Sequence, residues 1–428
     1  MKKVVKKIAL LLIVFGIGVG VTLLYTNNKY KVYEEEEPKQ IKKHVDTISM
    51  MLETEAGSGN YEMTTRSEWP TDGYIFNTTL SKCENGGELS WDDTNKRVLM
   101  SGNVSDKCYV YFDVYVPPTV VSDVCNGGET LSTCITTLSQ NSTSSYTNIY
   151  HHDSALANGA GDNSYRYAGA NPNNFVCFGT NTTPCPTDNL YRIIGVFGNQ
   201  VKLIKYDYAT SALLGTDGDY KGTGTPNASY YKGSLTTINT YYWNKATSKN
   251  TWSESNLNKV NLNTNFINNI RSEWAAKIAE TTWKVGGNTF ANIGTQPAKT
   301  AYQNEIVSPV TTNTTDGATE YSAKIGLMYV SDYMYAASQD KWTLVGNGSA
   351  TTDYRAATSV NWMYMGFGDW TISRIADNSS SVFGMYSTGY VDYGYVGGNS
   401  GCRPSFSLLS STTYVSGSGS ASDPMVIN

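Results

Sequence analysis

The sequence predicts an α+β protein that is mostly β and is held in a membrane by an N-terminal transmembrane helix. Short stretches of alternating apolar and polar residues recur between Gly-, Asn- and Asp-rich turns, which is typical of strands. Residues 8–25 form an uncharged apolar run of 18 residues, close to the length that a bilayer requires. Six of the seven cysteines fall into three pairs separated by short loops, which favours disulfide bonds.

The composition is that of an exported protein. Charged residues make up 16% of the 428 residues, below the average for soluble proteins, and 32 tyrosines with many Asn, Ser, Thr and Gly take their place. Such surfaces are typical of adhesins and binding loops. The net charge of −5 leaves no basic stripe, so we expect no nucleic-acid partner. The sequence contains no P-loop, dinucleotide fingerprint or G-x-S-x-G motif, and we expect no cofactor.

The apolar run is predicted to be an uncleaved anchor. Lysines precede it, so the positive-inside rule places residues 1–7 in the cytoplasm and the part after residue 25 outside the cell. A cleaved signal peptide is the alternative, but residues 21–28 offer no small-x-small cleavage site. The predicted localisation is the cell membrane, with residues 8–25 as the single span and the C-terminal part extracellular.

Residues 26–57 are expected to form a charged stalk that leads into a short amphipathic helix. Four apolar residues recur there at helical spacing: Ile41, Val45, Ile48 and Leu52. A small β domain is expected next over residues 58–118, followed by a linker with a local disulfide bond over residues 119–149.

The cysteine spacing predicts which residues pair. The expected disulfide bonds are Cys83 with Cys108, Cys125 with Cys134, and Cys177 with Cys185. Cys402 is left as a free thiol that behaves as a small buried hydrophobic side chain. Zinc is the alternative for paired cysteines, but the sequence has neither C-x2-4-C spacing nor histidines nearby, so we expect no metal site.

The main domain is expected over residues 150–428. Apolar segments on both sides of Gly198 and Asn199 predict a hairpin, since this pair supplies the positive φ of a tight turn. A helix capped by Thr264 is predicted because apolar residues then fall four apart, at Phe266, Ile270, Trp274 and Ile278. The remaining expectations are long loops over 286–319, a buried strand over 325–330, and strands over 370–372, 382–385 and 405–408 that bracket a long aromatic loop.

Several segments of this domain resemble, in order, those of C-type-lectin-like and sulfatase-modifying-factor-like domains in membrane-anchored bacterial surface proteins. They are NLYRIIGVF at 189–197, WSESNL at 252–257, LN at 262–263, KIGLMYVSDY at 324–333, GCRPSF at 401–406 and DPMVI at 423–427. The resemblance implies a C-type-lectin-like fold and ligand contact through the C-terminal loop. The Glu-Pro-Asn, Gln-Pro-Asp and Trp-Asn-Asp tripeptides of calcium-dependent sugar sites are missing from the sequence, as is a second cysteine after Cys185 to pair with Cys402 in catalysis.

The candidate contact surface is the Gly-rich loop over 386–399. It carries four tyrosines, Tyr386, Tyr390, Tyr393 and Tyr395, and exposed aromatic side chains on a rigid scaffold are typical of binding sites. The predicted function is therefore that of a cell-surface binding or adhesion protein, not an enzyme, whose ligand is an extracellular glycan or protein.

Two other functions stay open at this point. A surface hydrolase would use paired carboxylates, for which Asp369, Asp377 and Asp392 are the candidates. A structural spacer would have no ligand at all. The histidines at 151 and 152, followed by Asp153, are interpreted as a polar loop cluster, because adjacent side chains point apart and no third metal ligand is spaced nearby.

Overall fold

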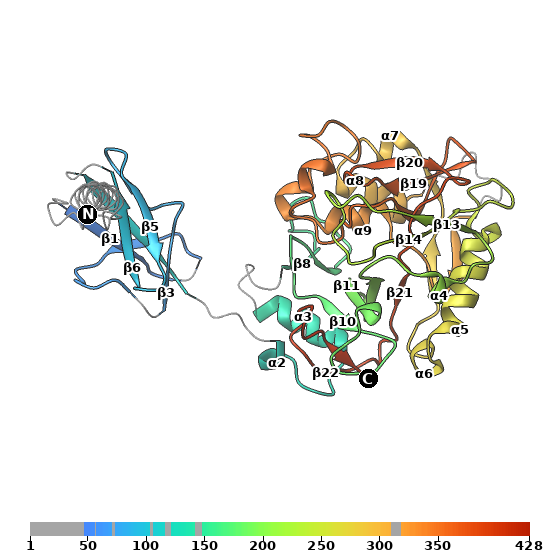
Figure 1. The fold of residues 1–428 in the computed structure, drawn as a ribbon, viewed down its shortest axis with the longest axis horizontal. Helices are drawn as coiled ribbons and strands as arrows, with labels where there is room; N and C mark the ends of the chain where they lie inside the picture. Colours follow the sequence, from blue (N-terminus) through green and yellow to red (C-terminus); the bar gives the residue numbers. More distant parts are fainter. Residues whose placement is uncertain are drawn as a thin grey trace, which may run out of the picture. The chain divides into compact units, whose positions relative to one another are not determined.

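The computed structural model describes residues 47–55, 57–70, 73–102, 106–115, 121–141, 148–309 and 318–428. The chain forms two compact units, residues 1–117 and 118–428, each of which is described by itself (Figure 1). Strands hold 31% of the residues and helices 19%, so the mostly β prediction is confirmed. The predicted anchor lies outside the described residues, and no helix within them is both long and apolar enough to cross a bilayer.

The N-terminal unit is a small twisted sheet with a separate hairpin. The strands of the sheet run in the order β2-β1-β7-β3, with β4 also paired to β7. Their bounds are β1 Thr47–Glu53, β2 Tyr61–Met63, β3 Tyr74–Phe76, β4 Lys82–Cys83 and β7 Lys107–Val114, and the hairpin strands are β5 Glu88–Asp92 and β6 Arg97–Ser101. Strands β1 and β7 pair in parallel.

The prediction of an amphipathic helix before residue 57 is wrong for the part of this segment that the structure describes. Ile48 and Leu52 lie in strand β1, while Ile41 and Val45 lie outside the described residues. Met50 falls between them with its side chain buried, so the segment follows a two-residue strand period. Pairing with β7 places Met50 opposite Val110 in the small core of this unit.

The C-terminal unit is built around a six-stranded sheet in the order β21-β12-β11-β9-β8, with β10 also paired to β11. Its strands are β8 Ile149–His151, β9 Tyr165–Tyr167, β10 Phe175–Cys177, β11 Leu190–Phe197, β12 Gln200–Lys205 and β21 Ser405–Ser407. Helix α3, Leu131–Asn141, packs its apolar face into the core of this unit through Leu131, Ile135 and Leu138. Figure 1 shows strand β22 and the C-terminus near α3.

A second sheet, of order β16-β18-β19-β20, forms the other main layer of this unit. Its strands are β16 Gly287–Asn288, β18 Asp369–Ile375, β19 Ser381–Met385 and β20 Val391–Tyr395. Short strand pairs complete the unit: β13 Tyr220–Gly224 with β14 Ile238–Tyr241, β15 Thr281–Lys284 with β17 Glu320–Ala323, and β22 Tyr414–Ser416 with β23 Val426–Ile427. The helices are short: α2 Val121–Val124, α4 Ser211–Leu214, α5 Ile267–Asn269, α6 Ser272–Ala275, α7 Phe290–Ile293, α8 Ala298–Tyr302 and α9 Val330–Tyr335.

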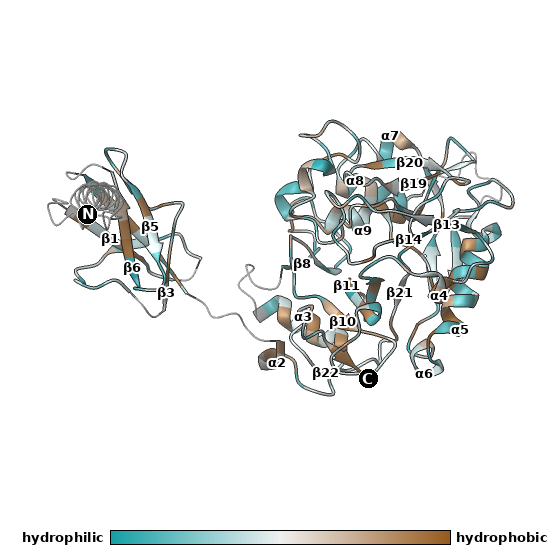
Figure 2. Ribbon diagram, viewed as in Figure 1, coloured by the Kyte–Doolittle hydropathy of each residue, from teal (hydrophilic) through white to brown (hydrophobic). Residues whose placement is uncertain are grey.

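The hairpin prediction is confirmed. Strands β11 and β12 are antiparallel, and Phe197 pairs with Gln200 across the two-residue turn. Gly198 has φ of +63°, the left-handed conformation for which glycine is favoured. Strands over 370–372, 382–385 and 405–408 also form, as β18, β19 and β21. In Figure 2, brown apolar residues alternate with hydrophilic ones along helix α3.

The helix expected from Thr264 to Ile278 is wrong in its bounds and its continuity. A π-helical segment begins at Leu257 and runs to Phe266, so Thr264 lies inside it and does not cap it. The Thr264 hydroxyl donates to the carbonyl of Lys259, five residues back, which competes with regular α-helical bonds. The chain is extended at Ile270, with ψ of 158°. The apolar pattern predicted the buried residues but not this break.

Two further expectations differ from the structure. The region 286–319 holds β16, α7, α8 and a π-helical turn at Gln303–Val307 in its described part, instead of long loops only. Thr289 caps α7 by accepting a hydrogen bond from the Asn292 amide. The segment 325–330 is buried but is not a strand, since its backbone pairs at one bridge, between Gly326 and Ser405.

Three disulfide bonds form: Cys83–Cys108, Cys125–Cys134 and Cys177–Cys185. These are the pairs expected from the spacing, and Cys402 is a buried free cysteine. Two groups of cysteines and acids lie close enough to hold a metal ion, Cys83, Asp106 and Cys108, and Cys125, Glu129 and Cys134. Their cysteines are bonded to each other, so the sulfur atoms are not thiolate ligands.

Candidate functional site

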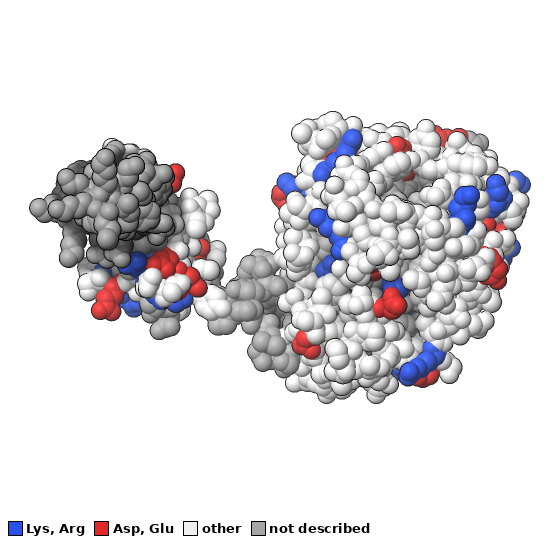
Figure 3. Space-filling view, viewed as in Figure 1, with Lys and Arg blue, Asp and Glu red and all other residues white. Residues whose placement is uncertain are grey.

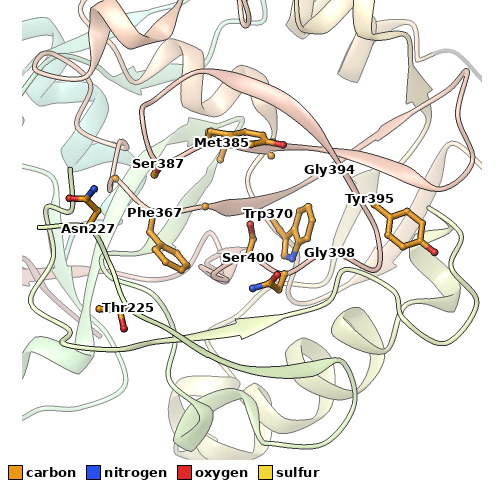
Figure 4. A pocket seen from close by; sticks show the side chains of 15 residues that line it. Thr225, Asn227, Phe367, Trp370, Met385, Ser387, Gly394, Tyr395, Gly398 and Ser400 are labelled. Carbon is orange, nitrogen blue, oxygen red and sulfur yellow. The ribbon is translucent and has the colours of Figure 1, made fainter. Parts of the chain in front are cut away.

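The surface of the C-terminal unit has a cleft of about 460 Å³ over the second sheet. We call it the glycine cleft after the five glycines in its wall. Its residues are Thr225, Asn227, Gly366, Phe367, Gly368, Trp370, Gly384, Met385, Tyr386, Ser387, Gly394, Tyr395, Gly398, Asn399 and Ser400. Figure 4 shows Asn227 and Phe367 toward one end, Tyr395 at the other, and Trp370 with Ser400 between them.

Trp370 on β18 forms the floor of the glycine cleft. Its indole Nε1 donates to the carbonyl oxygen of Tyr241 at 2.8 Å, and the ring is almost fully buried. Gly394 on β20 lies against this ring, and a Cβ added there would come within 3.0 Å of it. Glycine at this position therefore lets the strand pass close over the indole, which keeps the cleft open.

The opposite wall is fixed by a close crossing of two chain segments. Gly366 has φ of +77°, and a Cβ on it would lie 2.0 Å from the carbonyl oxygen of Tyr230. The hydroxyl of buried Tyr208 donates to the carbonyl oxygen of Phe367 at 2.9 Å. These contacts hold the Phe367 ring beside Thr225 and Asn227, so the wall is rigid before any ligand binds.

Among the residues that the structure describes, none with a charged side chain lines the glycine cleft. Its polar groups are hydroxyls and amides, from Thr225, Asn227, Ser387, Asn399 and Ser400, and its rings are Phe367, Trp370, Tyr386 and Tyr395. Apolar surface with a few neutral polar groups is the usual makeup of a site for a neutral organic ligand. Figure 3 shows large areas of this unit without charged side chains on the face that it presents.

The loop predicted over 386–399 is partly a strand. Val391, Tyr393 and Tyr395 alternate with Asp392 and Gly394, and they form β20 against β19. This alternation is the two-residue period of a strand, which the Gly and Tyr content of the segment concealed.

The structure brings two of the four predicted tyrosines into the glycine cleft, Tyr386 and Tyr395. Tyr390 stacks on Tyr386 with ring centroids 4.8 Å apart and so supports the cleft from outside. Tyr393 contacts Phe290 edge-on at 5.5 Å and is not part of the lining. Tyr393 and Tyr395 are equally exposed, at 50% each, so exposure alone does not distinguish them.

Sequence reasoning missed most of the other lining residues. Trp370 was expected only as a strand residue, and Asn227, Phe367, Asn399 and Ser400 were not singled out. One signal was present in the sequence: glycines flank Phe367, and two glycines precede Asn399. Glycines beside an aromatic or amide side chain often mark a place where another molecule approaches the backbone.

The three carboxylates considered for hydrolysis lie apart from the lining of the glycine cleft. Asp369 is buried and pairs with Arg403 at 2.5 Å. Burial raises the pKa of Asp369 to about 6, against the lowering effect of Arg403. Asp377 is exposed, and Asp392 accepts a hydrogen bond from the Tyr393 amide.

The histidine pair is only partly a polar loop. His151 ends strand β8 and stacks on Tyr165 at 4.3 Å, while the side chain of His152 is fully buried. The Nδ1 atom of His152 accepts a hydrogen bond from the Ala160 amide at 3.0 Å, so the ring is neutral. Burial lowers the pKa of His152 to about 2, and Arg166 adds to this effect. The two rings face different surroundings and form no shared site.

A scan against protein-family models and searches of curated proteins and solved structures found no match to this chain. The function is therefore argued from the geometry and chemistry of the site itself.

Proposed function

We propose that the protein is a membrane-anchored cell-surface binding protein whose C-terminal unit, as a C-type-lectin-like domain, binds a neutral glycan in the glycine cleft. The observation that carries the proposal is the lining itself, which combines aromatic rings with amides and hydroxyls and has no charged side chain. Sugars present CH faces that pack on rings and hydroxyls that pair with neutral donors and acceptors.

The rigidity of the cleft supports binding over a merely structural role. Glycines at 366 and 394 are required by close contacts, and the Trp370 indole is fixed by a hydrogen bond to Tyr241. A preformed site loses little conformational freedom when the ligand binds.

The carboxylates favour a binder over a hydrolase. Glycosidases need two acids that flank the bond to be cleaved, and the lining of the glycine cleft includes none. Incubation of the purified protein with chromogenic glycosides tests this point, because a binder releases no chromophore.

The binding test uses the full-length chain on a glycan array, with Tyr395→Ala and Tyr393→Ala beside it. These tyrosines lie two residues apart on β20 with equal exposure, but only Tyr395 lines the glycine cleft. We expect Tyr395→Ala to weaken glycan binding by about 1 to 2 kcal/mol, the usual contribution of an aromatic contact, and Tyr393→Ala to leave it unchanged.

Two results would reject the proposal. If the folded parent binds no glycan on the array, the ligand class is wrong, and a host-protein array then tests the protein-ligand alternative. If Tyr395→Ala binds as tightly as the parent, the glycine cleft is not the site.

The proposed membrane anchor is tested by a separate experiment, which determines where the mature protein begins. N-terminal sequencing of the membrane-bound protein is expected to begin at or next to Met1, because the apolar run lacks a cleavage site. A mature protein that begins near Thr26 would show instead that the run is a signal peptide.

A further inference from the structure

A second cavity of the C-terminal unit, of about 240 Å³, shares no lining residue with the glycine cleft. We call it the charged cavity, because its lining includes Asp162, Arg166, Lys202, Lys284 and Asp332. Its other residues are Phe197, Gln200, Thr281, Thr282, Trp283, Tyr302, Ile306, Tyr329, Ser331 and Ser407. It is open to solvent, so a small solute can enter it.

The charges at the base of this cavity are almost completely buried. Arg166 is 2% exposed, Lys202 6% and Asp332 3%. The Lys202 ammonium pairs with Asp332 Oδ2 at 2.5 Å, and Arg166 Nη2 pairs with Asp162 at 2.6 Å. Burying so many charges costs free energy even when they are paired, which is unusual for a purely structural cluster.

The two cations have more donors than the surrounding protein satisfies. A guanidinium and an ammonium together carry eight N–H donors. In the described part of the chain they donate three hydrogen bonds: Arg166 Nε to Ser164, Arg166 Nη2 to Asp162, and Lys202 to Asp332. Arg166 Nη1 lies 3.9 Å from Asp332 Oδ1, too far for a hydrogen bond.

The carboxylate oxygens to which the two cations already donate also accept other hydrogen bonds. Asp332 Oδ2, which accepts from Lys202, also accepts the Tyr329 amide at 2.9 Å. Asp162 accepts the Ser164 amide and hydroxyl as well as Arg166. Five of the eight N–H donors of Arg166 and Lys202 therefore have no acceptor among the described residues, and an incoming group that brings two oxygens would satisfy some of them.

Aromatic rings form the other walls. The Lys202 ammonium lies 4.5 Å from the centre of the Tyr329 ring and 5.3 Å from that of Trp283. The Arg166 guanidinium lies 5.1 Å from the Tyr302 ring. The rings hold both cations in place, and the apolar side chains of Phe197, Trp283 and Ile306 complete a lining against which the body of a ligand can pack.

We propose that the charged cavity binds a small organic carboxylate, with its two oxygens at Lys202 and Arg166 and its body against the aromatic wall. A carboxylate supplies two acceptors in one plane, and the ammonium of Lys202 and the guanidinium of Arg166 both line the cavity. This site is separate from the glycine cleft and does not depend on the function proposed for it.

The first experiment is calorimetric titration of the full-length chain with matched pairs of probes. Benzoate is compared with benzyl alcohol, and glucuronate with glucose, so that each pair differs in its charged group. We expect each acid to bind at least about tenfold more tightly than its neutral partner, because hydrogen bonds between charged groups are stronger than those to a neutral hydroxyl. If the cavity prefers benzoate, the body of its ligand is aromatic, and if it prefers glucuronate, the body is sugar-like. Equal binding of acid and neutral partner in both pairs would overturn the proposal.

The second experiment assigns binding to this cavity. Lys202→Met removes an ammonium that the carboxylate needs, and Lys221→Met removes an exposed lysine elsewhere on the unit as a control. We expect at least about tenfold weaker binding of the preferred acid for the first variant and no change for the second.

A second variant, Thr282→Trp, tests the same cavity if Lys202→Met does not fold. Thr282 is an exposed residue in the lining, so a tryptophan there narrows the cavity without altering its buried charges. We expect this variant to fold and to lose binding of the acid. Unchanged binding by Thr282→Trp, or by folded Lys202→Met, would overturn the proposal.

Discussion

Among the described residues, the buried apolar cluster of the N-terminal unit consists of Met50, Phe76, Val110 and Phe112, whereas one continuous core runs through both main sheets of the C-terminal unit. The buried charged residues are distributed just as unevenly. Most of them, including Arg166, Lys202 and Asp332, belong to the C-terminal unit. A large apolar core can offset the cost of buried charges and of cavities, whereas a small sheet with few apolar contacts gains relatively more from a covalent link.

The largest effect is expected from removing the disulfide bond of the small unit. Cys83 and Cys108 are 25 residues apart, and loss of that link destabilises the unit by about 3.5 kcal/mol on the chain-entropy estimate. Calorimetry of the full-length Cys83→Ser, Cys108→Ser variant is expected to show loss or a strong downward shift of one unfolding transition, since a small domain has little stability to spare.

The matched control is the Cys177→Ser, Cys185→Ser variant of the large unit. These cysteines are 8 residues apart, so the expected loss is smaller, about 2.5 kcal/mol, and the larger core still holds the unit folded. Equal decreases in the unfolding temperature of the two units, each in its own variant, would contradict this expectation.

A loss of stability of intermediate size is expected at low pH, because His152 of the C-terminal unit becomes protonated when the protein unfolds. Its pKa is about 2 in the folded protein, below the ordinary 6.5, so the folded state binds fewer protons than the unfolded state. Its contribution to stability is therefore complete at neutral pH and is lost as the pH falls below 6.5. At pH 4.5 this loss amounts to about 2.7 kcal/mol.

The variant His152→Asn tests this assignment. The asparagine oxygen can accept the Ala160 amide hydrogen bond but does not titrate. Chemical denaturation at pH 7 and pH 4.5 is expected to show a smaller pH dependence in the variant, even though its stability at pH 7 is lower because the ring is lost. An unchanged pH dependence would assign the acid sensitivity to other groups.

The smallest effect is expected at the floor of the glycine cleft. Gly394→Ala places a methyl group within 3.0 Å of the Trp370 ring, so we expect a loss of about 1 kcal/mol in unfolding free energy and weaker glycan binding. Gly127→Ala is the control, since its added Cβ meets one carbonyl oxygen at 3.3 Å. A variant at Gly394 that is as stable and binds as well as the parent would show that the floor is not tightly packed.

The sequence predicted best those features that depend on local patterns. The hairpin at Gly198 follows from turn chemistry, and the β18, β19 and β21 strands follow from alternation. The break at Ile270 was not predictable in the same way, because the contacts beside it, such as the hydrogen bond from the Asn269 side chain to the Leu213 carbonyl, join segments far apart in sequence. The prediction of a helix before residue 57 is wrong because pairing of this segment with β7 outweighs the weak helical preference that its apolar spacing indicated.

The candidate sites depend on residues that are far apart in sequence. Tyr386 and Tyr395 were found because they gather in one segment, but Asn227 joins them across more than 150 positions. The charged cavity was not foreseen, since Arg166, Lys202 and Asp332 occur in separate segments with no shared motif. Only the packing of the strands and helices brings such residues together.

The parallel pairing of β1 with β7 has a mechanical consequence. Since the two strands run the same way, Thr47 at the start of β1 and Val114 at the end of β7 lie at opposite ends of the pair, about 20 Å apart. A pull on both ends of this unit therefore acts along the strands and loads all the hydrogen bonds between residues 47–52 and 107–112 together. Bonds loaded in this shear geometry must break at once, whereas those of a hairpin pulled at its open end break one by one. A force applied between Thr47 and Val114 would thus meet its resistance in this small sheet.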